Sequence, residues 1–113
     1  MPKSIVVETT GSPSVLKWRD VEVGRPSKGE VTVRAKAIGV NFIDIYLRSG
    51  LYPTQLPFIP GGEMCGEIEA VGANSGGFKI GDRVATGTAG SGCYAEVRNI
   101  SVDKLVKVPK EIT

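Results

Sequence analysis

The segment that most sharply defines this chain is GVNFIDIYLRSGLYP, residues 39–53. Its apolar residues recur at helical spacing, with Phe42 four residues before Tyr46 and Ile43 four residues before Leu47. Asn41 is a favourable N-cap, and Gly50 supplies a C-terminal stop. These signals predict one short helix of about two turns over residues 41–48.

The polar residues of this helix share its other side. Asp44 precedes Arg48 by four residues, which is the favourable order for an ion pair along a helix. We therefore expect Arg48 to be a structural partner of Asp44.

Most of the remaining sequence predicts short strands. Residues 31–37 alternate apolar and polar side chains, and residues 16–19 do the same. Residues 20–23 continue in the opposite phase, which predicts a bulge near Arg19. Further strands are expected at residues 5–8, 67–71, 82–85, 94–98 and 105–108. The fold class is thus mainly β, an antiparallel barrel or sandwich with one or two short helices.

Composition narrows the function classes. The chain has 113 residues, which suits one domain, and its 15 Gly and 7 Pro indicate many turns. A net charge of +2 is too small to indicate nucleic acid or an anionic membrane as a partner. With no His, the chain holds no Ser-His-Asp triad and no His-containing metal site. Cys65 and Cys93 lack the C-x-x-C spacing of zinc or redox sites. We expect two free thiols in a cytoplasmic domain, with a single Cys65–Cys93 disulfide as the alternative.

The loop after the helix, residues 51–62, is both rigid and apolar. Pro53, Pro57 and Pro60 exclude a central strand. Such a loop is expected to bury itself or to form the wall of a pocket.

The segment at residues 39–53 resembles the signature of the zinc-independent quinone oxidoreductases, which belong to the medium-chain dehydrogenase/reductase superfamily. The stretches PFIPGGE (57–63), Gly66 to Gly72, and GDRV (81–84) follow in the family's order. This resemblance implies a GroES-like, partly open β-barrel over residues 1–113, the catalytic, substrate-side domain. A Rossmann domain that binds NADPH is then expected downstream, and the full-length protein is expected to be a homodimer.

The zinc-dependent alcohol dehydrogenases of the same superfamily are similar around these residues. They carry a zinc-ligating Cys where this chain has Asn41, and a ligating His where it has Gly62. The resemblance therefore implies no metal, and the role of Glu63 stays open. Without zinc, hydrogen-bond donors would polarise the substrate carbonyl.

The resemblance also implies site residues. Asn41, Tyr46 and Tyr52 are the catalytic candidates, and Asn41, Phe42, Ile43, Asp44 and Tyr46 are the cofactor-binding candidates. Each has a structural alternative: Asn41 as a helix cap, Tyr46 as a core residue, Tyr52 as loop packing and Asp44 as the partner of Arg48.

The chain contains one further glycine-rich motif. Residues 90–95, GSGCYA, match G-x-G-x-x-A, the fingerprint of a dinucleotide-binding turn. The residues that follow alternate like a strand, so a turn without phosphate binding is predicted.

The expected activity of the full-length protein is hydride transfer from NADPH to quinones or related conjugated carbonyls. Two alternatives remain open at this stage. One is a stand-alone GroES-like binding or scaffolding module without catalysis, and the other is an enoyl or alkenal reductase of the same superfamily.

Overall fold

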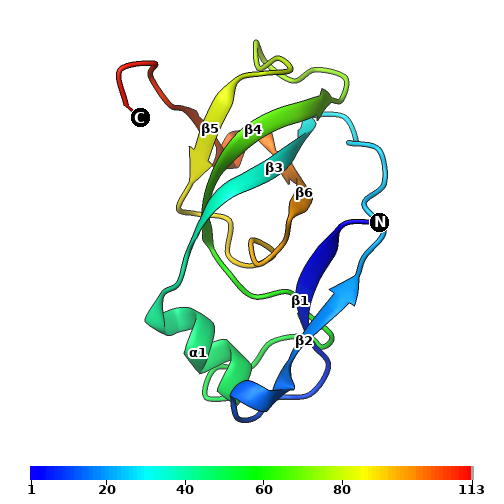
Figure 1. Cartoon of the computed structure of the whole chain (residues 1–113), viewed down its shortest axis with the longest axis vertical. Coiled ribbons are helices and arrows are strands. Elements are labelled where there is room, and N and C mark those ends of the chain that lie inside the picture. Colours follow the sequence, from blue (N-terminus) through cyan, green and yellow to red (C-terminus); the bar gives the residue numbers. More distant parts are fainter. Residues whose placement is uncertain (113) are drawn as a thin grey trace.

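The computed structural model describes residues 1–112 as two antiparallel sheets and one α-helix (Figure 1). The smaller sheet pairs β1 (Lys3–Val7) with β2 (Leu16–Asp20). The larger sheet has the order β6-β3-β4-β5-β7. Its strands are β3 (Glu30–Gly39), β4 (Glu63–Val71), β5 (Arg83–Thr86), β6 (Val97–Ser101) and β7 (Val106–Lys107). The helix α1 (Phe42–Ser49) and two 3₁₀ turns, η1 (Pro13–Val15) and η2 (Val102–Lys104), complete the elements.

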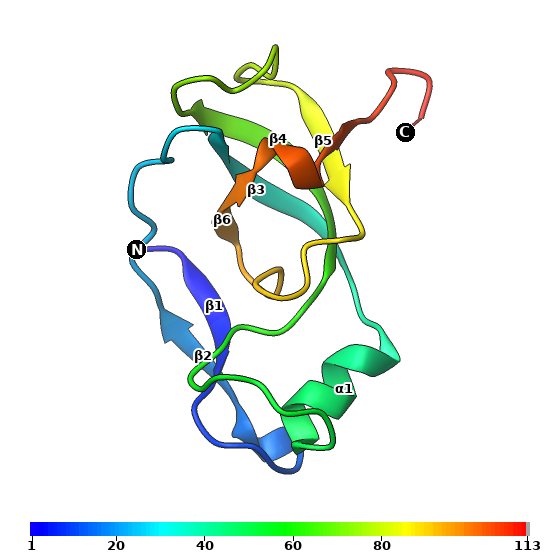
Figure 2. The ribbon, with the colours of Figure 1, turned by 180° about the vertical axis from the view of Figure 1, so that it is seen from behind.

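The larger sheet curls back on itself. Its two edge strands, β6 and β7, are joined only by η2 and Leu105, so the opposite edges of the sheet must lie close together. Figure 2 shows β6 and η2 crossing in front of β3 and β4. No strand pairing joins β6 to β7 within residues 1–112, so the barrel stays partly open. The expected mainly β class with a partly open barrel is confirmed.

The core lies inside this curled sheet. Val31 and Val33 of β3 and Ile68 of β4 are at most 1% exposed, as strand alternation predicts. The cluster is completed by Met64, Val84, Cys93, Ile100 and Leu105. Cys93 is buried and Cys65 is half-buried, and both are free thiols, as predicted.

The expected strand over residues 20–23 is wrong. β2 ends at Asp20, and its register with β1 runs without a break from Lys3 opposite Asp20 to Val7 opposite Leu16. The predicted bulge near Arg19 is therefore absent as well. The bulges lie instead between β3 and β4, at Thr32–Val33 and at Ala35–Ala37.

The starts of β4 and β6 differ most from the prediction. β4 begins at Glu63 rather than at residue 67, because its first residues pair with the end of β3. β6 begins at Val97 rather than at residue 94, and Ala95 instead bridges to Ser4 of the smaller sheet.

The loop over residues 51–62 divides in two. Phe58 is buried and forms a bridge with Val7 of β1, and Pro60 is buried too. Leu51 and Tyr52 remain exposed. Only the second half of the loop therefore buries itself as expected. Within residues 1–112, no helix has the length and apolar character needed to cross a membrane.

Candidate functional site

Helix α1 lies at one end of the molecule, directly after the long strand β3 (Figure 1). Its limits agree with the sequence: Asn41 is the N-cap, and Gly50 ends the helix in the left-handed conformation at φ 89°. The orientation of the helix, however, differs from the usual pattern of apolar residues inside and charged residues outside.

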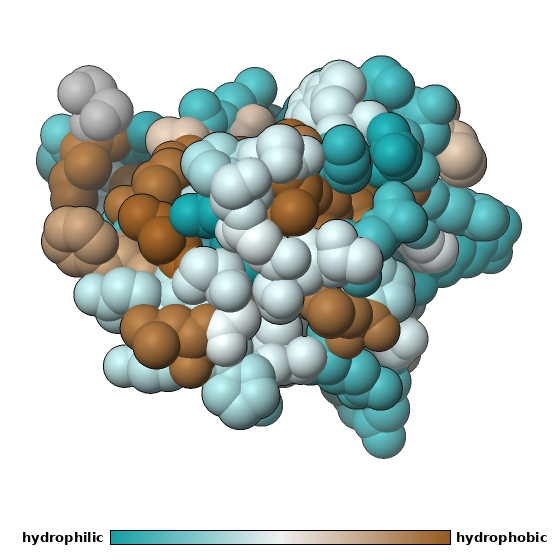
Figure 3. Space-filling model, turned by 90° about the horizontal axis from the view of Figure 1, so that it is seen from below, coloured by the Kyte–Doolittle hydropathy of each residue, from teal (hydrophilic) through white to brown (hydrophobic). Residues whose placement is uncertain are grey.

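Asp44 is the one buried residue of α1, with 2% of its surface exposed. Phe42, in contrast, is 76% exposed, and Ile43 and Ile45 are exposed as well. Figure 3 views the molecule from this end and shows hydrophobic patches interrupting a largely polar surface. Tyr46, for which a core position was the structural alternative, is half-buried.

The carboxylate of Asp44 is held by two donors. Its Oδ2 accepts the backbone N–H of Asn41 at 3.0 Å and the hydroxyl of Tyr94 at 2.8 Å. The other oxygen, Oδ1, is buried and has no hydrogen-bond partner within residues 1–112.

The predicted ion pair between Asp44 and Arg48 is wrong. Asp44 turns back toward the N-cap in a capping box, while Arg48 donates to the backbone carbonyl of Gly11. The two side chains thus leave the helix in different directions, although both line a cavity of about 210 Å³ under α1.

Tyr94 contacts the first turn of α1 through its hydroxyl group. Burial raises the pKa of its phenol well above the ordinary value of 10.0, and the hydrogen bond to Asp44 and the charge of Asp44 raise it further. The phenol therefore stays protonated at neutral pH and acts as a donor to Asp44.

Asn41 reaches across to the start of β4. Its Nδ2 donates to Oε1 of Glu63 at 2.9 Å. Gly39 is opposite Glu63 in the β3–β4 register, and a Cβ on Gly39 would lie 2.5 Å from the Glu63 carboxyl group. The glycine therefore leaves the space in which Glu63 meets Asn41.

Tyr46 and Tyr52 form a second cluster. Their ring centroids are 5.3 Å apart with an interplanar angle of 63°, an edge-to-face contact. The backbone N–H of Tyr52 also donates to the carbonyl of Tyr46 at 3.1 Å. Within the described part of the chain, no hydrogen bond links this pair to the cluster of Asn41, Asp44, Glu63 and Tyr94.

The sequence analysis assigned no functional role to Tyr94 and left that of Glu63 open. The contact of Glu63 with Asn41 can be predicted once the register of β3 and β4 is known, because Glu63 lies opposite Gly39 and Asn41 follows two residues later. Tyr94 carries no local signal, since its partner Asp44 lies fifty residues away in the sequence.

Two features of the chain bear on metal and phosphate binding. No group of three or more His, Cys, Asp or Glu side chains that could hold a metal ion occurs among residues 1–112. The glycine-rich stretch at residues 90–95 forms a turn with Gly90 and Gly92 at positive φ, and a strand follows it rather than a helix. The prediction of a turn is confirmed.

Comparison with known proteins relates the chain to dehydrogenases. The family model described as "Alcohol dehydrogenase GroES-like domain" matches residues 27–110. The chain is 48% identical over 113 residues, 99% of its length, to a quinone oxidoreductase of Pseudomonas aeruginosa, of which it covers 35%. It is 37% identical, over 99% of its length, to a 2-haloacrylate reductase of Burkholderia sp, of which it also covers 35%.

A solved structure agrees with this relationship. The Escherichia coli quinone oxidoreductase complexed with NADPH superposes with a TM-score of 0.94 at 39% identity. The match covers 98% of this chain and 34% of that one. The chain thus spans about a third of the length of the proteins that it matches.

Proposed function

Because the chain belongs to the family of alcohol dehydrogenase GroES-like domains, we propose that it is the substrate-side domain of an NADPH-dependent quinone oxidoreductase. The observation that carries this proposal is the 48% identity to a quinone oxidoreductase over nearly the whole chain. The similar Escherichia coli enzyme forms a complex with NADPH, which supports the choice of cofactor.

The exposed start of α1 is the proposed contact with the nicotinamide. Phe42 and Ile43 offer apolar surface there, since Phe42 is 76% and Ile43 43% exposed. Because the side chain of Asp44 is buried, Asp44 can contact the cofactor only through its backbone. Its carboxylate contributes indirectly, by accepting the backbone N–H of Asn41. NADPH supplies the hydride in this proposal.

The chain's own contribution is to hold and polarise the substrate. Asn41 keeps a second N–H on Nδ2 besides the one that it gives to Glu63, so it can donate to a quinone oxygen. Tyr46 and Tyr52 can donate through their phenols. As the hydride arrives, charge develops on the quinone oxygen, and preorganised donors of this kind stabilise it. A proton from solvent completes the reduction to the hydroquinone.

We further propose that the site uses no zinc. An amide already engaged with Glu63 and a glycine, at positions 41 and 62, are unsuited to ligate zinc. The remaining parts of the proposal are a Rossmann domain beyond this chain, a homodimeric full-length protein, a cytoplasmic location, and no nucleic-acid or membrane partner.

The test is made on the full-length protein. NADPH oxidation is followed at 340 nm with a panel of quinones, and NADH replaces NADPH in a parallel series. Turnover that survives exhaustive chelation supports a zinc-free quinone oxidoreductase. Absence of turnover with every quinone would overturn the proposal.

A second candidate is reduction of an activated carbon–carbon double bond. The 37% identity to a 2-haloacrylate reductase favours it. Enones and acrylates are therefore added to the panel, and the products are identified by mass spectrometry. Saturation of the double bond without quinone turnover would select this second activity.

The third possibility, a binding module without catalysis, is separated by the same preparation. A full-length protein that binds neither NADPH nor NADH in a fluorescence titration would favour the module.

A further inference from the structure

Tyr94 joins three parts of the molecule. Its backbone N–H donates to Pro60 at 2.8 Å, and its backbone carbonyl accepts from Ile5 of β1 at 2.8 Å. Its phenol donates to Asp44 of α1. One residue thus connects the smaller sheet, the loop before β4 and the helix that carries the candidate site.

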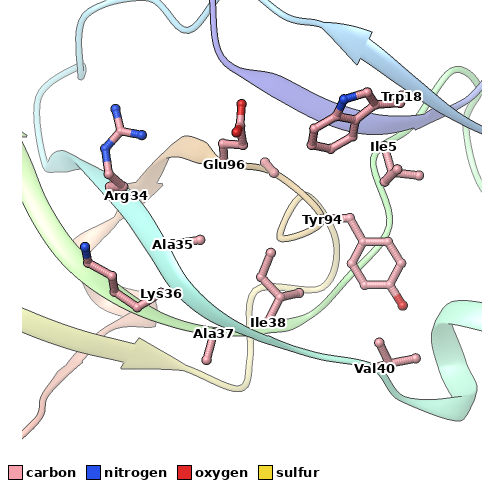
Figure 4. Close-up of a pocket in the computed structure, with 11 residues that line it drawn as sticks. Ile5, Trp18, Arg34, Ala35, Lys36, Ala37, Ile38, Val40, Tyr94 and Glu96 are labelled. Carbon is pink, nitrogen blue, oxygen red and sulfur yellow. The ribbon is translucent and has the colours of Figure 1, made fainter.

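The ring of Tyr94 is confined by its surroundings. A Cβ on Gly61 would lie 2.5 Å from Cδ1 of Tyr94, so the ring packs directly on the backbone of that glycine. Figure 4 shows the phenol on the wall of a groove of about 450 Å³, between Ile5 and Val40, with its hydroxyl directed toward the start of α1. The backbone and ring of Tyr94 are therefore held by β1 and by the loop before β4, and only its hydroxyl bonds to the helix.

The same oxygen of Asp44 accepts from Tyr94 and from the N–H of Asn41. If the Tyr94 hydroxyl is removed, this oxygen keeps only the donor within its own helix. A buried carboxylate that loses a donor is poorly compensated, so it is expected to move toward other donors or solvent. The N-cap, and with it the side chain of Asn41, would then lose its fixed position relative to β4.

We propose that Tyr94 is a positioning residue for the reaction: through Asp44 it holds the first turn of α1, and so places the Asn41 amide where the substrate binds. This inference rests on the proposed function and adds a residue outside α1 and its loop. Tyr94 itself does not touch the substrate in this proposal.

The test compares Tyr94→Phe with Thr32→Val in the full-length protein. Thr32 also uses a mostly buried hydroxyl, which donates to Asn99 at the far end of β3, and is a matched control for the loss of one such bond. Misplacement by about 1 Å can cost 100-fold in rate, so kcat of Tyr94→Phe with a quinone is expected to fall by about 10-fold or more. KM for the quinone should stay within about 2-fold, because the donors themselves remain. Thr32→Val should leave both constants unchanged.

Hydrogen–deuterium exchange supplies a second measurement. Amides of residues 41–46 are expected to exchange faster in Tyr94→Phe and at the wild-type rate in Thr32→Val. An unchanged kcat in Tyr94→Phe, or an equal fall of kcat in both variants, would overturn the inference. If the wild-type protein reduces no quinone, the proposed function fails, and with it the effect of Tyr94 on the reaction. In that case the exchange rates still decide whether Tyr94 holds the helix.

Discussion

The side-chain amide of Asn41 donates to the carboxylate of Glu63 at 2.9 Å, across the end of the β3–β4 pair. The contact exists because Gly39 lies opposite Glu63 and has no side chain to fill the space between them. A hydrogen bond to a charged acceptor is stronger than a neutral one, so Glu63 orients the Asn41 amide. The second Nδ2 hydrogen of Asn41 is not used in this contact.

Replacement of Glu63 is expected to lower activity by releasing this amide. Glu63→Ala in the full-length protein should reduce kcat for a quinone about 5-fold, since one hydrogen bond contributes about 1 kcal/mol. Glu63→Gln keeps an acceptor oxygen and should stay within about 2-fold of wild type. Glu67→Ala removes an exposed carboxylate from the same face of β4 and is the control. Equal activity of Glu63→Ala and Glu67→Ala would contradict the role of Glu63.

The tyrosine pair should act together. Tyr46→Phe and Tyr52→Phe are each expected to lower kcat about 10-fold, a modest loss for a donor to developing charge. Their rings touch, so the double variant is expected to lose less than the product of the two single effects. Ser49→Ala, which removes an exposed hydroxyl near the end of α1, should not change kcat. Additive losses in the double variant would show that the two phenols act independently.

Phe42 is expected to contribute to cofactor binding and not to the stability of this domain. Its side chain is 76% exposed, so Phe42→Ala should leave the thermal midpoint of the protein nearly unchanged. If the ring packs on the nicotinamide, its loss removes about 1–2 kcal/mol of apolar contact, or about 10-fold in NADPH affinity. Ile80→Ala, at an exposed site in the turn before β5, is the matched control for a fluorescence titration. Unchanged NADPH affinity in Phe42→Ala would remove Phe42 from the cofactor site.

Gly61 is expected to tolerate no side chain. Its φ is +101°, and an added Cβ would lie 2.5 Å from the ring of Tyr94. Gly61→Ala should lower the free energy of unfolding by about 2–4 kcal/mol through backbone strain and overlap. Gly76→Ala has the positive φ but open space, and should lose about 1 kcal/mol. Gly87→Ala meets neither condition and should be neutral in urea unfolding. Equal losses at positions 61 and 76 would show that the Tyr94 ring gives way easily.

Cys93 is expected to make the free energy of unfolding depend on pH under alkaline conditions. Burial raises the pKa of its thiol above the ordinary value of 9.0, although nearby Arg98 opposes this shift. The folded chain therefore binds this proton more tightly than the unfolded chain. The resulting stability is fully present below pH 9.0, and it decreases as pH rises through that value because only the unfolded thiol ionises.

Cys93→Ala removes this titrating thiol. Comparison with wild type therefore separates its effect on stability from that of other groups that titrate at alkaline pH. The difference in unfolding midpoint between wild type and Cys93→Ala should shrink from pH 7 to pH 10. In the folded protein, iodoacetamide should modify Cys65, which is half-buried, before Cys93, as peptide mapping can show. Early modification of Cys93 would contradict its burial.

Local signals in the sequence predicted much of this molecule. The Asn41 cap, the Gly50 stop and the spacing of Phe42 and Tyr46 are all contained within one short segment, so the helix and its limits followed from them. Strand alternation likewise located β3 and its buried valines. Strand ends were less certain, because the end of β2 and the start of β4 depend on the partner strand.

The amino-acid order alone was therefore enough for a mainly β domain with one capped helix, and for the resemblance that names its site residues. Tertiary packing was needed to show that Asp44 turns inward to Tyr94, that Arg48 leaves it for Gly11, and that Asn41 meets Glu63. The physical reason is the separation along the sequence over which each kind of interaction acts. Caps and periodicity act within a few residues, whereas these contacts join segments that become neighbours only when the sheets pair.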